Sequence, residues 1–222
     1  MKSELIKIVF CLLVLLAASV SPNLFVVSQA GYALLSSLAI YFLIPSIAVI
    51  AIIYGLSYGL GLQDIRRQIQ NGIIAGWMST AGLEIVREIG FHLGGMPGDM
   101  PKLLGVLLLN RFALGPNALS NLAGWSYHFW NGAAFGIIYS ILAGKGRIWM
   151  GIIYALLIAT GFMMSPAVVA MGVGHFGINF GWGFPLTVIL AHLAFGSLLG
   201  WVIYRLNEKD QSLFTRVKRL FR

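Results

Sequence analysis

The chain has 222 residues, of which 59% are apolar and only 10% are charged, and its mean hydropathy is +0.86. Soluble domains carry about 25% charged residues, so the composition excludes an ordinary soluble domain and predicts an all-α, polytopic integral membrane helix bundle. The net charge of +8 does not indicate nucleic-acid binding, because the basic residues lie in short loops and the C-terminal segment, as in cytoplasmic parts of membrane proteins. The single cysteine, Cys11, excludes an intrachain disulfide.

Six apolar segments are long enough to cross a bilayer. We interpret the first as an uncleaved span rather than a signal peptide, because its apolar character resumes after Pro22. The second contains Pro45 and is long enough to tilt or kink, and the fifth contains Pro166. The expected spans are residues 5–27, 32–62, 69–93, 118–142, 148–171 and 184–206.

A shorter apolar segment, residues 102–114, is better interpreted as a re-entrant or interfacial helix, because about 20 residues are needed to cross a bilayer. If this segment does not cross, both termini and most basic residues lie on the cytoplasmic side, as the positive-inside rule requires. If it crosses, Lys145, Arg147 and the C-terminal tail move outside. We therefore predict six spans, one non-crossing helix, and a basic cytoplasmic tail over residues 207–222 that is solvated and has no specific partner.

The third span carries the least expected residues of the chain. Glu84, Glu88 and His92 are spaced i, i+4 and i+8, so on a helix they form one stripe. Arg87 lies beside this stripe. Ionisable side chains are costly in hydrocarbon and commonly mark a pathway, a relay or a ligand site. The stripe is therefore the predicted functional site.

Two later segments repeat one pattern, a histidine followed by glycines at intervals of four. The copies are His128-x3-Gly132-x3-Gly136 and His192-x3-Gly196-x3-Gly200. They permit a parallel internal repeat, although glycines at this spacing are typical of closely packed membrane helices. The second copy resembles the last helix of small uncharacterised bacterial and archaeal multi-span families, and this resemblance implies no activity.

The expected topology gives each ionisable group a depth. At a rise of about 1.5 Å per residue, both histidines lie about 12–15 Å from the outer boundary, close to the layer of the two carboxylates. This places Glu84, Glu88, His128 and His192 together in an outward-opening intramembrane site. Further histidine and aspartate side chains lie at the outer boundary or in outer loops: His92, Asp99 and His175.

In the first of three hypotheses, this site holds a divalent metal. Carboxylates and imidazoles together suit zinc, iron or manganese, and such a centre could support redox or hydrolytic chemistry on a lipophilic substrate. The expected ligands are Glu84, Glu88, His128 and His192. The two carboxylates, with His92, His175 and Asp99, would serve as catalytic, entry or proton-transfer groups.

The other two hypotheses use the same residues differently. A haem could take His128 and His192 as axial ligands, with Arg87 at a propionate. Alternatively, Glu84 and Arg87, at i and i+3, neutralise each other, either as structural packing or as a proton or ion relay. That relay would belong to a transporter or to an accessory subunit of a larger membrane complex or homo-oligomer. The sequence leaves these alternatives open.

Overall fold

The computed structural model describes residues 2–221, so Met1 and Arg222, the end of the expected tail, lie outside the described part, as do the side chains of Lys2 and Ser3. Residues 2–221 contain helices and no strand, which confirms the all-α class. The helices are α1 Lys2–Gln29, α2 Leu35–Leu38, α3 Ile44–Gly59, α4 Gln63–His92, α5 Met100–Leu108, α6 Ala118–Ala143, α7 Ile148–Met164, α8 Pro166–Ala170, α9 Gly183–Leu206 and α10 Leu213–Leu220. A π-helical segment, Ala39–Leu43, joins α2 to α3, and short 3-10 turns cover Phe112–Leu114 and His175–Gly177.

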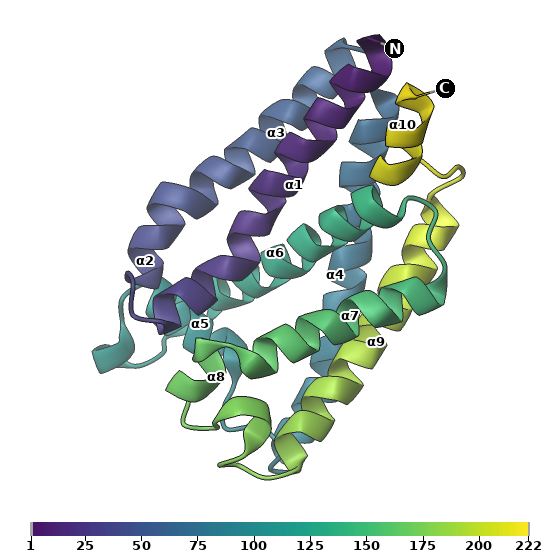
Figure 1. The fold of residues 1–222 in the computed structure, drawn as a ribbon. Helices are drawn as coiled ribbons and strands as arrows, with labels where there is room; N and C mark the ends of the chain where they lie inside the picture. Colours follow the sequence, from purple (N-terminus) through teal and green to yellow (C-terminus); the bar gives the residue numbers. More distant parts are fainter. Residues whose placement is uncertain (1, 222) are drawn as a thin grey trace.

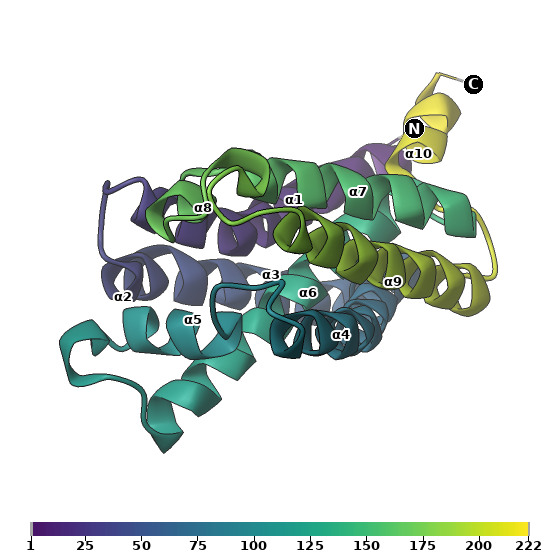
Figure 2. The ribbon, with the colours of Figure 1, turned by 90° about the horizontal axis from the view of Figure 1, so that it is seen from below.

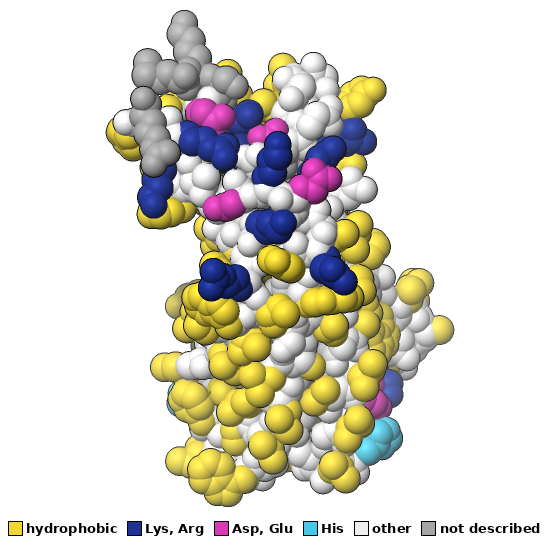
Figure 3. Space-filling view, turned by 90° about the vertical axis from the view of Figure 1, so that its right-hand side faces the viewer, with side chains coloured by type: hydrophobic (Ala, Val, Ile, Leu, Met, Phe, Trp, Pro, Cys, Tyr) yellow, Lys and Arg dark blue, Asp and Glu magenta, His cyan; other side chains and the backbone are white. Residues whose placement is uncertain are grey.

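Three helical segments are long and apolar enough to cross a membrane: Glu4–Gln29, Leu35–Gly59 and Gly183–Leu206. Large apolar side chains on them face outward, such as Leu16, which is 69% exposed. Figure 3 shows basic and acidic side chains gathered at one end of the molecule above a mainly apolar surface. An apolar surface of this extent indicates a protein whose surroundings are lipid.

Helix α4 lies at the centre of the arrangement and packs against both α6 and α9 (Figure 1). Helix α7 covers α9, α1 covers α6, and α3 lies beside α1. Figure 2, seen from below, shows α7 and α9 on one side of α4, and α5 beside α6 on the other. Both termini lie at the same end of the molecule (Figure 1).

Glycines allow the closest approaches between these helices. At these positions an added Cβ atom would collide with the facing helix, with its backbone in every case except Gly132, where it would meet the side chain of Thr80. The glycines are therefore needed for the close contact between the helices. The α4–α6 contact joins Gly72 and Gly76 to Gly132 and Gly136, and the α7–α9 contact joins Gly151 to Gly196 and Gly200. The glycines of both repeated motifs are therefore packing residues.

The structure divides the expected span 148–171 at Ser165. Helix α7 ends at Met164, Ser165 is extended with φ −75° and ψ 156°, and α8 starts at Pro166. A residue before proline is driven out of the helical region by the proline ring, which explains the break. The expected helix 102–114 is also shorter, because α5 ends at Leu108 and Asn110 takes a positive φ of 51°.

The C-terminal tail is docked on the helices through Arg216, while Lys218 and Arg219 of the same tail are exposed, so the prediction of a wholly solvated tail needs correction. Arg216 of α10 is fully buried, and its guanidinium donates hydrogen bonds of 3.1 Å to Asp64 and 3.1 Å to Gln68, both on α4. Lys7 of α1 approaches the same Asp64 carboxylate at 3.1 Å. These ion pairs join α1, α4 and α10 at the end of the molecule where the termini lie.

The stability of this junction is expected to depend on pH. Partial burial raises the pKa of Asp64, but hydrogen bonds from Lys7 and Arg216 outweigh that effect and hold the pKa below its usual range. A carboxyl with a lowered pKa stabilises the fold at pH values above about 4, and this contribution is lost as the pH falls through the folded-state pKa. Wild type should therefore exceed Asp64→Asn in thermal unfolding midpoint at pH 7, and the gap should shrink towards pH 3. A difference in unfolding midpoint between the two proteins that does not change with pH would contradict a stabilising role of the ionised Asp64.

Candidate functional site

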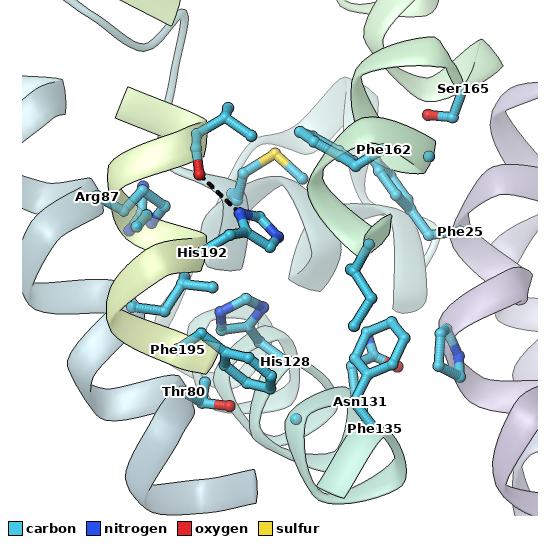
Figure 4. Close-up of a pocket in the computed structure, with 18 of the residues that line it drawn as sticks. Phe25, Thr80, Arg87, His128, Asn131, Phe135, Phe162, Ser165, His192 and Phe195 are labelled. Carbon is cyan, nitrogen blue, oxygen red and sulfur yellow. Dashed lines mark hydrogen bonds between the residues drawn. The ribbon is translucent and has the colours of Figure 1, made fainter. Parts of the chain in front are cut away.

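A cavity of about 510 Å³ lies between α1, α4, α6, α7 and α9, and is closed at one side by the segment leading into α5. Phenylalanines from four helices form much of its wall: Phe25, Phe135, Phe162 and Phe195. Polar side chains interrupt this wall in a few places, notably at Arg87, Asn131 and the two histidines of the repeated motif (Figure 4). A mainly apolar cavity of about 300–1,000 Å³ with a few convergent polar groups is typical of a ligand site.

The cavity opens sideways between α1 and α7. These two helices have little direct contact along the described chain. Asn23 of α1 and Gly161 of α7 both line the cavity and are exposed at the molecular surface. A Cβ atom added at Gly161 would meet nothing within 4 Å. The opening thus lies along the sides of two long apolar helices, where lipid chains would surround the protein.

Glu84 and Arg87 form a buried ion pair beside the cavity, and their side chains are only 9% and 5% exposed. The Arg87 Nε donates to Glu84 Oε1 at 2.8 Å and to Oε2 at 2.9 Å, and Nη2 donates to Oε2 at 2.7 Å. Such charge-assisted, multiply bonded pairs are the strong ones. The i, i+3 pairing considered from the sequence is therefore present.

His128 of α6 joins this pair from across the helix interface. Its Nε2 lies 2.9 Å from Glu84 Oε1, and the ring lines the cavity. Because the carboxylate only accepts hydrogen bonds, Nε2 is the donor, and Nδ1 makes no hydrogen bond to the residues that the structure describes. The carboxylate thus fixes the orientation of the ring at the cavity wall.

His192 of α9 is fixed by its own helix. Its Nδ1 lies 2.8 Å from the carbonyl oxygen of Val188, one turn earlier. Figure 4 shows His192 and His128 one above the other on the same side of the cavity, with the bonded nitrogen of His192 turned away from the open space. No carboxylate pairs with His192 among the described residues. Both histidines of the repeated motif therefore face one cavity.

The outer part of the stripe leaves the interior. Glu88 and His92 are 48% and 73% exposed and lie 3.3 Å apart at an apolar groove on the outer side of α4. Asp99 caps the start of α5 and lies 3.8 Å from Arg87 Nη2, but it does not line the cavity. His175 is exposed in a 3-10 turn away from the cavity lining. The structure thus does not place these four at the interior site.

Two buried polar atoms at the cavity have no hydrogen-bond partner among the described residues. They are Nη1 of Arg87 and Oγ of Ser165, and both residues line the cavity. Their side chains come from opposite walls, α4 and the break between α7 and α8 (Figure 4). Buried polar atoms in native proteins are nearly always paired, and a polar group of a ligand in the cavity is one partner that would pair these two.

The arrangement does not support the metal hypothesis. Of the four expected ligands, the structure brings only Glu84 and His128 into contact. Glu88 points to the outer groove and His192 is bonded to a backbone carbonyl. In residues 2–221 no group of three or more His, Cys, Asp or Glu side chains is placed to hold a metal ion.

The haem hypothesis meets a steric obstacle. It requires the glycines after His128 and His192 to leave space for a porphyrin. Gly136, Gly196 and Gly200 instead face the backbones of α4 and α7, and Gly132 faces the side chain of Thr80, so that no Cβ atom fits at any of the four. Arg87, the expected partner of a propionate, has Nε and Nη2 bonded to Glu84 and leaves only Nη1 unpaired among the described residues.

Sequence reasoning missed several polar residues of the cavity wall. Thr80 lies one turn before Glu84 and extends the same stripe, so its spacing was an available signal. Thr187 and Ser165 had no such signal, because a single hydroxyl in an apolar helix is ordinary. Asn131, which the sequence suggested as a group that could support a metal ligand, accepts a hydrogen bond from Ser21 of α1 and lines the cavity.

Comparison with known proteins identifies a family whose function is unknown. No curated protein and no solved structure matches the chain. Residues 66–214, which include α6, α7, α9 and most of α4, match the model of a family of unknown function, DUF6789. That match covers more than half of the 222 residues, and the chain belongs to this family.

Proposed function

We propose that this protein binds a lipophilic molecule in its intramembrane cavity. The apolar part of the ligand lies among the phenylalanines and leaves between α1 and α7, and its polar end lies beside His128 and His192. The observation that carries the proposal is the cavity of about 510 Å³ that opens sideways and is lined by two unpaired buried polar atoms. A void filled only by lipid tails would leave those atoms without partners, at a cost of about 1–3 kcal/mol each.

We also propose a multi-pass arrangement with six spans and both termini in the cytoplasm. The common end of the two termini (Figure 1) and the basic residues gathered at one end (Figure 3) support this orientation. Under the positive-inside rule that end faces the cytoplasm. The cavity, its polar wall and the outer groove then lie in the outer half of the membrane.

Gly161→Phe is expected to block ligand binding without disturbing the helices. Its new side chain starts in open space at the mouth of the cavity, and replacing a helical glycine does not lower helix propensity. Native mass spectrometry of the purified protein, titrated with monoolein in detergent micelles, should show saturable binding of one molecule per chain. The variant should bind at least about tenfold more weakly, because about 1.4 kcal/mol of lost contact suffices for that factor.

Gly55→Phe is the matched control. Gly55 lies on α3, is exposed, lines neither cavity nor groove, and has nothing within 4 Å of an added Cβ atom. It should bind monoolein as the wild type does. Equal binding by wild type and Gly161→Phe, or binding that never saturates, would contradict the proposed function.

A further inference from the structure

We propose that the polar end of the ligand is uncharged and combines a hydroxyl group with a carbonyl oxygen, as in a monoacylglycerol. This inference rests on the proposed binding of a lipophilic molecule in the cavity. It follows from the hydrogen-bonding roles of three side chains that share one side of the cavity: His128, His192 and Arg87 (Figure 4).

His192 offers the ligand a hydrogen-bond acceptor. The carbonyl oxygen of Val188 cannot donate, so the proton of the imidazole is on Nδ1. Burial of a charged ring without a carboxylate partner is costly, and His192 has none among the described residues, so the ring is neutral. Its Nε2 then carries a lone pair, which a ligand hydroxyl group can satisfy.

His128 offers a second ring nitrogen to the ligand. Its Nε2 donates to Glu84, its Nδ1 makes no hydrogen bond within residues 2–221, and the ring lines the cavity. A hydroxyl group both donates and accepts hydrogen bonds, so it can pair with this nitrogen as well as with Nε2 of His192. A ligand that has only acceptors leaves the lone pair of His192 without a donor.

Arg87 offers the ligand a hydrogen-bond donor. Its Nη1 is a buried donor without a partner among residues 2–221, so the ligand must bring an acceptor. Three carboxylates already lie near Nη2, at 2.7 Å for Glu84, 3.3 Å for Glu88 and 3.8 Å for Asp99. A further anion would be repelled by this excess of negative charge. A carbonyl oxygen accepts the hydrogen bond without that repulsion.

Five probes with the same eighteen-carbon unsaturated chain separate these requirements. Monoolein has hydroxyl groups and a carbonyl, oleyl alcohol has only a hydroxyl, methyl oleate has only a carbonyl, and oleate and oleylamine are charged. In native mass spectrometry titrations, monoolein should bind most tightly. Oleyl alcohol and methyl oleate should each bind about tenfold more weakly, which corresponds to one lost hydrogen bond, and the two charged probes more weakly still.

His192→Phe keeps a ring in the cavity wall and removes its acceptor. It should reduce the preference for monoolein over methyl oleate about tenfold, whereas Phe195→Leu, which alters the same wall without removing a polar group, should keep that preference. Oleate binding as tightly as monoolein, or equal binding of monoolein and methyl oleate, would overturn the inference while leaving the proposed function standing if Gly161→Phe still blocks binding. A series in which Gly161→Phe weakens no probe would overturn both.

Discussion

Glu84→Ala is expected to destabilise the protein by about 3–5 kcal/mol, the largest effect of a single substitution considered for this fold. The carboxylate holds both Arg87 and His128, and its removal leaves the guanidinium of Arg87, 5% exposed, deprived of its closest partner. An uncompensated buried charge costs far more than the loss of an average hydrogen bond. The measurement is the free energy of unfolding by denaturant of the purified protein in detergent.

A double variant separates the effect of the unpaired charge on stability from the effect of lost side-chain packing. Replacing both residues, as Glu84→Met with Arg87→Met, removes the charges together and should recover most of the lost stability, because a buried ion pair exchanged for apolar residues of similar volume is often neutral. Glu208→Ala, whose carboxylate is 80% exposed and lies 3.9 Å from Arg67, is the control for an exposed ion pair and should change stability by less than about 1 kcal/mol. A double variant as unstable as Glu84→Ala would show that the ion pair is not what holds this region.

Gly76→Ala is expected to be the second most damaging substitution, at about 1–3 kcal/mol, the range for overpacking a tight contact. The added methyl group would meet the backbone of Gly132 and Ala133 on α6, and backbone atoms of a packed helix cannot turn aside as a flexible side chain can. Alanine otherwise favours a helix over glycine by about 1 kcal/mol. Gly55→Ala on α3, where the methyl group meets nothing within 4 Å, should therefore raise the thermal unfolding midpoint slightly. Equal midpoints for the two variants would contradict the tight α4–α6 contact.

Much of this fold could be predicted from hydropathy, because segments that pair their own backbone groups and face lipid must be long and apolar. The segments expected at 118–142 and 184–206 agree closely in their bounds with the helices α6 and α9, and α9 is also long and apolar enough to cross a membrane. The break at Ser165 was harder to place, since proline is tolerated inside many membrane helices. The burial of Arg216 had no local signal, because its partners Asp64 and Gln68 lie about 150 residues earlier in the chain.

The candidate site was predictable only in part, because its geometry also depends on contacts between segments that are far apart in the sequence. Helical spacing placed Glu84, Glu88 and His92 on one stripe, and depth counting brought His128 to the level of Glu84, which it contacts. The rotation of α4 about its axis was not available from spacing, yet it decides that Glu84 faces His128 while Glu88 is half exposed at the outer groove. The gap between α1 and α7, which makes the cavity, depends on tertiary packing alone.

Photolabelling tests most directly whether a lipid occupies this cavity. Monoolein with a diazirine in its acyl chain would be added to the protein in bilayers, irradiated, and the labelled peptides mapped. Labelling should concentrate on α1 near Pro22 and Val26 and on α7 near Ile158 and Gly161, which line the opening. Excess unlabelled monoolein and the Gly161→Phe variant should both suppress it. Label spread over the exposed face of α3, and not reduced by competition, would contradict binding in the cavity.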